Sequence, residues 1–206
     1  DVVIKLIPTK NDNYFVCMRL CSIQDNRFAY RKNVLPTSMH PSQAALIVSL
    51  AKPYLKETAQ IMDPFCGVGT LLIERAHLVP AREIYATDTY GDAITMGREN
   101  AAFAKTRINF IHRDFFDFRH DYKFDELITD MPVRNRQTKA EMELFYERFF
   151  DKAAEHLVSG GIIVMYSNEI GFVKKQIRLR VEYRLLQETC ILDKKDFYLF
   201  VIRYED

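Results

Sequence analysis

Two short stretches of the 206-residue chain combine acidic residues with glycines or prolines in patterns that can do chemistry. In the first, residues 61–74, an apolar segment ends at Asp63 and the following loop carries Gly67 and Gly69. Glycine is needed where the backbone takes a positive φ or approaches a ligand closely. A helix should follow, with Thr70 as its N-cap. A strand, a glycine loop and a helix start together predict a nucleotide-type site at the carboxyl end of a sheet.

The details of this loop disfavour a phosphate site. It lacks the lysine of a P-loop, and its spacing is not G-x-G-x-x-G. Asp63 would repel a pyrophosphate and suits a ligand with a positive charge and hydroxyl or amine donors. A plain glycine turn before a core helix is the alternative. Asp88 ends the next predicted strand, about 20 residues past the loop, where an acid accepts hydrogen bonds from ribose hydroxyls. Its alternative role is to cap the helix predicted over 91–104.

The second stretch is Asp130-Met131-Pro132-Val133, directly after a strand predicted over 124–130. This stretch resembles a motif of methyltransferases that act on planar amino groups, and the resemblance implies that the acidic side chain at the strand end and a backbone carbonyl held by proline accept from the two N–H groups of such an amine. Such an amine is a poor nucleophile, because its lone pair is delocalised into the ring. Accepting both N–H bonds steers the lone pair and stabilises the positive charge that develops on nitrogen. An Asp-capped turn is the alternative without function.

The first stretch, Asp-Pro-Phe-Cys-Gly-Val-Gly-Thr, resembles the first motif of class I S-adenosylmethionine (SAM)-dependent methyltransferases. The resemblance implies SAM as the cofactor, held by Asp63, Phe65, Cys66, Gly67, Gly69, Thr70 and Asp88. It also implies that Asp114, after a strand at 108–111, accepts from the adenine amino group, with Asp117 as its competitor. A segment placed like residues 35–41 closes over the methionine end of SAM in that family. His40 is therefore expected near the ligand, unless it is a surface or capping residue.

The second stretch is similar to the (N/D)-P-P-(Y/F) motif of methyltransferases that act on planar amino groups. In that reading Asp130 supplies the side-chain acceptor, Met131 the carbonyl and Pro132 the fixed turn. The sequence departs from the motif at Val133, where an aromatic residue would stack on the base, a contact worth ~1–3 kcal/mol. Three explanations are open: another aromatic residue substitutes for it, the target base is unusual, or the protein is catalytically weakened. The candidates to substitute are Phe15, Phe65 and Phe115.

Basic residues follow the second motif. Arg134 and Arg136 are expected to contact phosphates beside the target base. The equally weighted alternative is that these arginines are ordinary charged surface residues before a helix.

The element pattern predicts an α/β fold. Strands at 61–63, 83–88, 108–111, 124–130 and 162–166 alternate with helices at 42–50, 70–78, 91–104, 139–156 and 170–179, and two final strands span 183–191 and 197–204. Gly160-Gly161 is expected to precede the 162–166 strand. Ser38 or Ser42 is expected to cap the 42–50 helix. Residues 192–195 are expected to form the last turn. The prediction is a Rossmann-like, mostly parallel seven-stranded sheet with helices on both faces. It occupies residues 35–206, after a small β extension over 1–34 with strands at 2–7, 14–22 and 27–30.

Composition sets further bounds. Net charge is +1, so no overall polycation holds nucleic acid, and a local patch or a further domain must do so. The four cysteines show no metal-ligand spacing, and no metal is expected. No apolar run approaches the length of a membrane span, no signal peptide is visible, and a cytoplasmic location is expected.

The order and spacing of the motifs are most similar to those of the tRNA and rRNA guanine-N2 methylases that carry an N-terminal THUMP RNA-binding domain. The chain starts with Asp and has no room for a THUMP domain, so we expect that an upstream RNA-binding part belongs to it. The leading hypothesis is transfer of a methyl group to guanine N2 in RNA, with tRNA ahead of rRNA. The alternatives are adenine-N6 methylation of DNA or RNA and a SAM-binding module without activity. The oligomeric state is left open.

Overall fold

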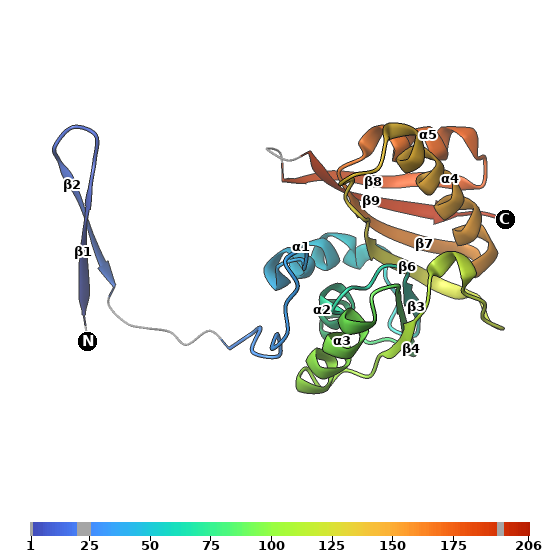
Figure 1. Ribbon diagram of the computed structural model, residues 1–206, viewed down its shortest axis with the longest axis horizontal. Coiled ribbons are helices and arrows are strands. Elements are labelled where there is room, and N and C mark those ends of the chain that lie inside the picture. Colours follow the sequence, from blue (N-terminus) through green and yellow to red (C-terminus); the bar gives the residue numbers. More distant parts are fainter. Residues whose placement is uncertain (1, 20–25, 193–195) are drawn as a thin grey trace.

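In the computed structural model, which describes residues 2–19, 26–192 and 196–206, the main body is an open α/β sheet (Figure 1). Seven strands lie in the order β5-β4-β3-β6-β7-β9-β8. The bounds are β3 (Gln60–Asp63), β4 (Glu83–Asp88), β5 (Asn109–His112), β6 (Phe124–Asp130), β7 (Leu157–Ser167), β8 (Tyr183–Leu192) and β9 (Phe197–Tyr204). The strands from β5 to β7 are parallel, and β9 pairs antiparallel with both β7 and β8. The predicted mostly parallel seven-stranded sheet is confirmed.

Helices cover both faces of this sheet because successive strand residues point to opposite sides. Ile61 and Ile128 face α1 (Pro41–Ala51), α2 (Thr70–Leu78) and α3 (Gly91–Phe103). Their neighbours Met62 and Leu127 face α4 (Lys139–His156) and α5 (Ile170–Leu179). Two short 3-10 turns, η1 (Lys52–Tyr54) and η2 (Phe115–Asp117), complete the body. The chain reverses its direction of winding between β3 and β6, which is where α/β sheets bind ligands.

The N-terminal residues form a separate hairpin of β1 (Val3–Pro8) and β2 (Tyr14–Arg19). Every residue of both strands is exposed, and Figure 1 shows the hairpin away from the main sheet. The two predicted strands are thus present, although the end of the 14–22 prediction lies outside the described residues. The predicted strand at 27–30 is wrong: i+3 hydrogen bonds from Ala29 to Asn26 and from Arg31 to Phe28 fold this segment into turns.

Residues 26–40, which we call the strap, lead from the hairpin to α1 and pack on the main body. The buried ring of Tyr30 donates its O–H to the carboxylate of Glu74 in α2. The buried side chain of Asn100 in α3 accepts from the backbone N–H groups of Lys32 (3.0 Å) and Asn33 (2.9 Å), and it donates to the carbonyls of Asn33 (2.9 Å) and Val68 (3.4 Å). Asn100 therefore ties the strap to the glycine loop.

Three local predictions need correction. The N-cap of α2 is Gly69 in the left-handed region, so Thr70 is its first residue. The N-cap of α1 is His40, whose ring accepts from the N–H of Ser42, rather than Ser38 or Ser42. Gly160 and Gly161 lie inside β7, where the pairing with β6 shifts register, because the strand begins at Leu157. Residues 193–195, part of the predicted last turn, lie outside the described residues.

Candidate active site

Three adjacent parallel strands each end in an aspartate, and all three aspartates line one cavity. Asp88 ends β4, Asp63 ends β3 and Asp130 ends β6, in the spatial order β4-β3-β6. The cavity has a volume of about 340 Å³, within the range of small-molecule sites. The sheet therefore brings together three acids that are distant in sequence.

The glycine loop forms the floor of the cavity, and the structure requires glycine at both of its glycine positions. Gly67 has φ of 50° and Gly69 has φ of 78°, a region that side chains rarely adopt. A Cβ on Gly69 would also lie 2.8 Å from the ring of Phe110. Asp88 fixes the loop from the side, because its Oδ2 accepts from the N–H of Gly67 (2.8 Å) and its Oδ1 from the N–H of Tyr90 (2.9 Å).

Asp63 is buried at the back of the cavity. Its Oδ1 accepts from the N–H of Phe65 (3.0 Å). Burial raises the pKa of Asp63 to about 8, and the nearby carboxylates of Asp130 and Asp88 also raise it, whereas the N–H of Phe65 lowers it. A positively charged ligand would relieve both the burial cost and this repulsion. The site therefore suits a cation.

Thr70 offers a further ligand group. Thr70 lines the cavity, and its buried hydroxyl makes no hydrogen bond within the described residues. Buried polar groups normally have a partner, so this hydroxyl is a natural contact for a bound molecule. The buried thiol of Cys66 also lines the cavity, and burial raises its pKa.

Asp130 and the residues after it form the opposite wall. Burial raises the pKa of Asp130 to about 7, so this carboxyl can both accept and release a proton near neutral pH. The N–H of Met131 donates to the carbonyl of Tyr166 (2.9 Å), which anchors the turn to β7. Pro132 and Val133 complete this wall, and Val133 is 51% exposed.

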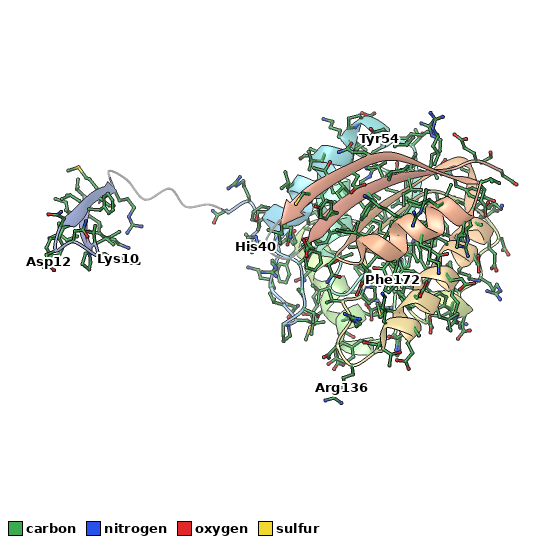
Figure 2. The ribbon with its side chains drawn as sticks, turned by 90° about the horizontal axis from the view of Figure 1, so that it is seen from above. Lys10, Asp12, His40, Tyr54, Arg136 and Phe172 are labelled. Atoms are coloured by element: carbon green, nitrogen blue, oxygen red, sulfur yellow. The ribbon has the colours of Figure 1, made fainter. Side chains whose placement is uncertain are left out.

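The strap covers the cavity, and His40, the strap residue expected near the ligand, is not among the lining residues. Leu35, Thr37, Ser38 and Met39 line the cavity, but His40 does not. His40 is exposed at the start of α1, where the N-terminal segment joins the body (Figure 2). Its ring faces Ser42, with Nδ1 2.7 Å from Oγ. The position of the segment in the sequence indicated the strap; the pattern gave no means to select its lining residues.

Two other predicted groups also lie off the cavity. Asp114 caps η2 by accepting from the N–H of Phe116 (2.9 Å), and it is absent from the cavity lining. Arg134 is 3.7 Å from the carboxylate of Glu169, and Arg136 projects from the edge of the body in Figure 2. Of the proposed substitutes for the missing aromatic, Phe15 is 67% exposed on the hairpin and Phe115 is buried. Phe65 lines the cavity.

Comparison with known proteins decides the family. The sequence profile of the RMKL-like methyltransferase domain matches residues 29–189. The chain belongs to this family. It is a class I SAM-dependent methyltransferase domain, and SAM is its cofactor. The buried acid at Asp63, the unsatisfied hydroxyl of Thr70 and the acid at Asp88 fit a ligand that carries a sulfonium, an amino group and ribose hydroxyls.

Individual relatives agree with this assignment. A tRNA (guanine(10)-N2)-dimethyltransferase of Methanothermobacter thermautotrophicus is 31% identical over 187 residues, covering 85% of this chain and 54% of that protein. A release factor glutamine methyltransferase of Lactococcus lactis is 25% identical, covering 66% of this chain and 56% of that protein. The chain thus spans about half the length of these curated relatives.

The crystal structure of TrmN from Thermus thermophilus superposes with a TM-score of 0.74 at 20% identity, covering 98% of this chain and 60% of that one. This likeness supports the fold. Within the described residues, no helix has both the length and the apolar character needed to cross a bilayer.

Proposed function

We propose that the protein is an RNA methyltransferase that modifies the exocyclic N2 of a guanine, in tRNA ahead of rRNA. The observation that carries the proposal is Asp130, placed on the wall opposite the cofactor residues with a pKa raised to about 7. The M. thermautotrophicus relative, named for guanine-N2 methylation of tRNA, supports the choice of base and of RNA.

In the proposed reaction the chain orients the amine and receives its proton. Bound SAM supplies a methyl group made electrophilic by its sulfonium sulfur. The carboxylate of Asp130 accepts a hydrogen bond from one N–H of the guanine amine, and the carbonyl of Met131 accepts a hydrogen bond from the other. The lone pair of the amine would then face the electrophilic methyl group, which SAM held by Asp63, Thr70 and Asp88 would supply for transfer to nitrogen. The extra proton on nitrogen leaves to the carboxylate of Asp130 or to water.

Rigid placement of the two acceptors accounts for most of the expected acceleration. Orientation of two bound reactants can supply ~7–11 kcal/mol in ideal cases. The anchor from Met131 to Tyr166 and the fixed φ of Pro132 hold the turn in place. Asp63, Thr70 and Asp88 hold the cofactor in this proposal, together with Phe65, Cys66, Gly67 and Gly69 of the loop. We also propose that residues 1–34 connect the domain to an upstream RNA-binding part.

The test is transfer of radiolabelled methyl groups from SAM into total RNA and into total protein, followed by nucleoside and amino-acid analysis. Wild type should place label in N2-methylguanosine, and Asp130→Ala should lose it while keeping its affinity for SAM. Asp121→Ala is the matched control, because Asp121 is exposed and lies off the cavity.

A different labelled product would assign a different function to the protein. Label in N6-methyladenosine would assign adenine-N6 chemistry, which uses the same acceptors. Label in glutamine would assign the activity for which the L. lactis relative is named. SAM binding without label in any fraction would contradict the RNA assignment.

A further inference from the structure

A second hollow adjoins the cavity beyond the Asp130 wall. It has a volume of about 280 Å³ and lies between the loop after β6 and the first turns of α4. Pro132 and Val133 line both this groove and the cavity, so the groove begins where the cavity ends. Its other lining residues come from the loop and from α4, and they are Gln137, Glu141, Met142, Leu144, Phe145 and Arg148.

Aromatic rings connect the groove to the cofactor side of the molecule. The half-buried ring of Phe145 lies 5.4 Å from that of Phe65, which lines the cavity, and 5.5 Å from that of Phe116. The exposed guanidinium of Arg148 lies 4.2 Å above the ring of Phe116. A cluster of three packed rings therefore connects the cavity to the groove, and Arg148 lies over one of them.

This combination fits a nucleotide. A nucleobase stacks on an aromatic face with little regard to sequence, and a guanidinium binds phosphate. At the other end, Glu141 is held by Thr138, whose N–H (2.7 Å) and Oγ1 (2.9 Å) donate to its Oε2. A carboxylate there accepts from base N–H groups and repels phosphate. The charges thus orient the nucleotide with its phosphate toward Arg148.

We propose that this groove binds the nucleotide next to the methylated one, with its base against Phe145 and its phosphate at Arg148. The proposal rests on the RNA methyltransferase function proposed above. Val133 lines both hollows, so a nucleotide in the groove would lie directly beside the one whose amine faces Asp130.

The chain contains no tryptophan, so Phe145→Trp creates a single fluorescent reporter in the groove. Titration with short single-stranded oligoribonucleotides should quench it saturably, and adding Arg148→Ala should weaken the apparent affinity about tenfold. Leu179→Trp is the control, since Leu179 is 65% exposed on α5 and should show only linear, collisional quenching. Equal linear quenching in both reporters would overturn the proposal.

Kinetics separate this proposal from the parent function. Phe145→Leu, which keeps apolar volume but removes the stacking face, should lower kcat/KM for RNA about 5- to 150-fold, with SAM affinity and the identity of the methylated nucleoside unchanged. Phe145→Tyr keeps an aromatic face and should have a kcat/KM for RNA close to that of wild type. Arg148→Ala should also lower kcat/KM for RNA, whereas Arg119→Ala, a control at an exposed arginine, should not. If wild type methylates RNA and these variants match it, the groove proposal fails alone. If wild type does not methylate RNA, both fail.

Discussion

The two walls of the cavity are built in different ways. The cofactor wall, which is Asp63, Gly67, Thr70 and Asp88 and holds SAM in the proposed function, is supported by hydrogen bonds such as that from the N–H of Gly67 to the carboxylate of Asp88 (2.8 Å). The substrate wall, which is residues 130–133 and faces the amine in that proposal, is anchored by the bond from Met131 to Tyr166 but ends at Val133, which is 51% exposed. Variants in each wall should therefore affect different steps.

The largest effect should come from Asp130→Ala. The change removes the side-chain acceptor that orients the amine, so kcat should fall by about 10²- to 10⁴-fold. Single-turnover methyl transfer measures this loss, and calorimetry should show SAM affinity close to wild type. Turnover at the wild-type rate would remove Asp130 from the proposed mechanism.

Asp63→Asn should affect the other step. It keeps the shape of the side chain and removes the charge, so SAM affinity should fall by about 10- to 150-fold, the equivalent of ~1.5–3 kcal/mol for a hydrogen bond to a charged group. Calorimetric titration with SAM measures it, with exposed Asp121→Asn as the control. An unchanged dissociation constant would mean that Asp63 only shapes the loop.

The pH profile sharpens the contrast further. Burial raises the pKa of Asp130 to about 7, and the protonated form cannot accept an N–H bond through that oxygen. At saturating SAM, kcat should therefore fall tenfold per pH unit on acidification below the inflection. The positive charge of bound SAM favours the carboxylate, so the inflection should lie at or somewhat below pH 7. A constant rate down to about pH 4, the ordinary range of an aspartate, would contradict this assignment.

Asn100→Ala tests the cover of the cofactor wall. The change leaves the N–H groups of Lys32 and Asn33 without their acceptor, which should cost about 1–3 kcal/mol of stability. For a domain of this size, that lowers Tm by roughly 2–4 °C for each kcal/mol. Thermal unfolding measures the shift, with exposed Asn109→Ala as the control. Equal Tm values would show that the strap is held without Asn100.

Arg136→Ala should have the smallest effect. Arg136 is exposed, and loss of one phosphate contact should weaken RNA binding only a few-fold. The slope of log affinity against log salt concentration should fall by roughly the share of one phosphate contact. Binding assays across a salt series measure both, and Arg113→Ala serves as the comparison. A salt slope identical to that of wild type would exclude a phosphate contact at Arg136.

The same contrast explains what the sequence could predict. The cofactor wall depends on local pattern: a strand end, glycines at positive φ and an acid after the next strand, all readable over 26 residues from Asp63 to Asp88. The bounds of β6, α4, α5 and β9 were also predictable, because apolar periodicity marks them. The helix caps were not, since whether Gly69 or Thr70 caps α2 depends on backbone angles.

The substrate side could not be read locally. Phe145 and Arg148 lie on α4 and look like ordinary residues of an amphipathic helix. Only the packing of α4 beside β6 brings them next to Val133. His40 and Asp114 share a related feature that the sequence did not reveal: neither lines the cavity, and the side chain of each accepts from a local backbone N–H.

The most direct test measures SAM affinity and single-turnover methyl transfer side by side for Asp63→Asn and Asp130→Ala. Asp63→Asn should weaken SAM binding but keep most of the transfer rate at saturating SAM, whereas Asp130→Ala should bind SAM normally and lose transfer. If both variants lost SAM affinity equally, or if Asp130→Ala transferred methyl groups at the wild-type rate, the separate roles of the two walls would be contradicted.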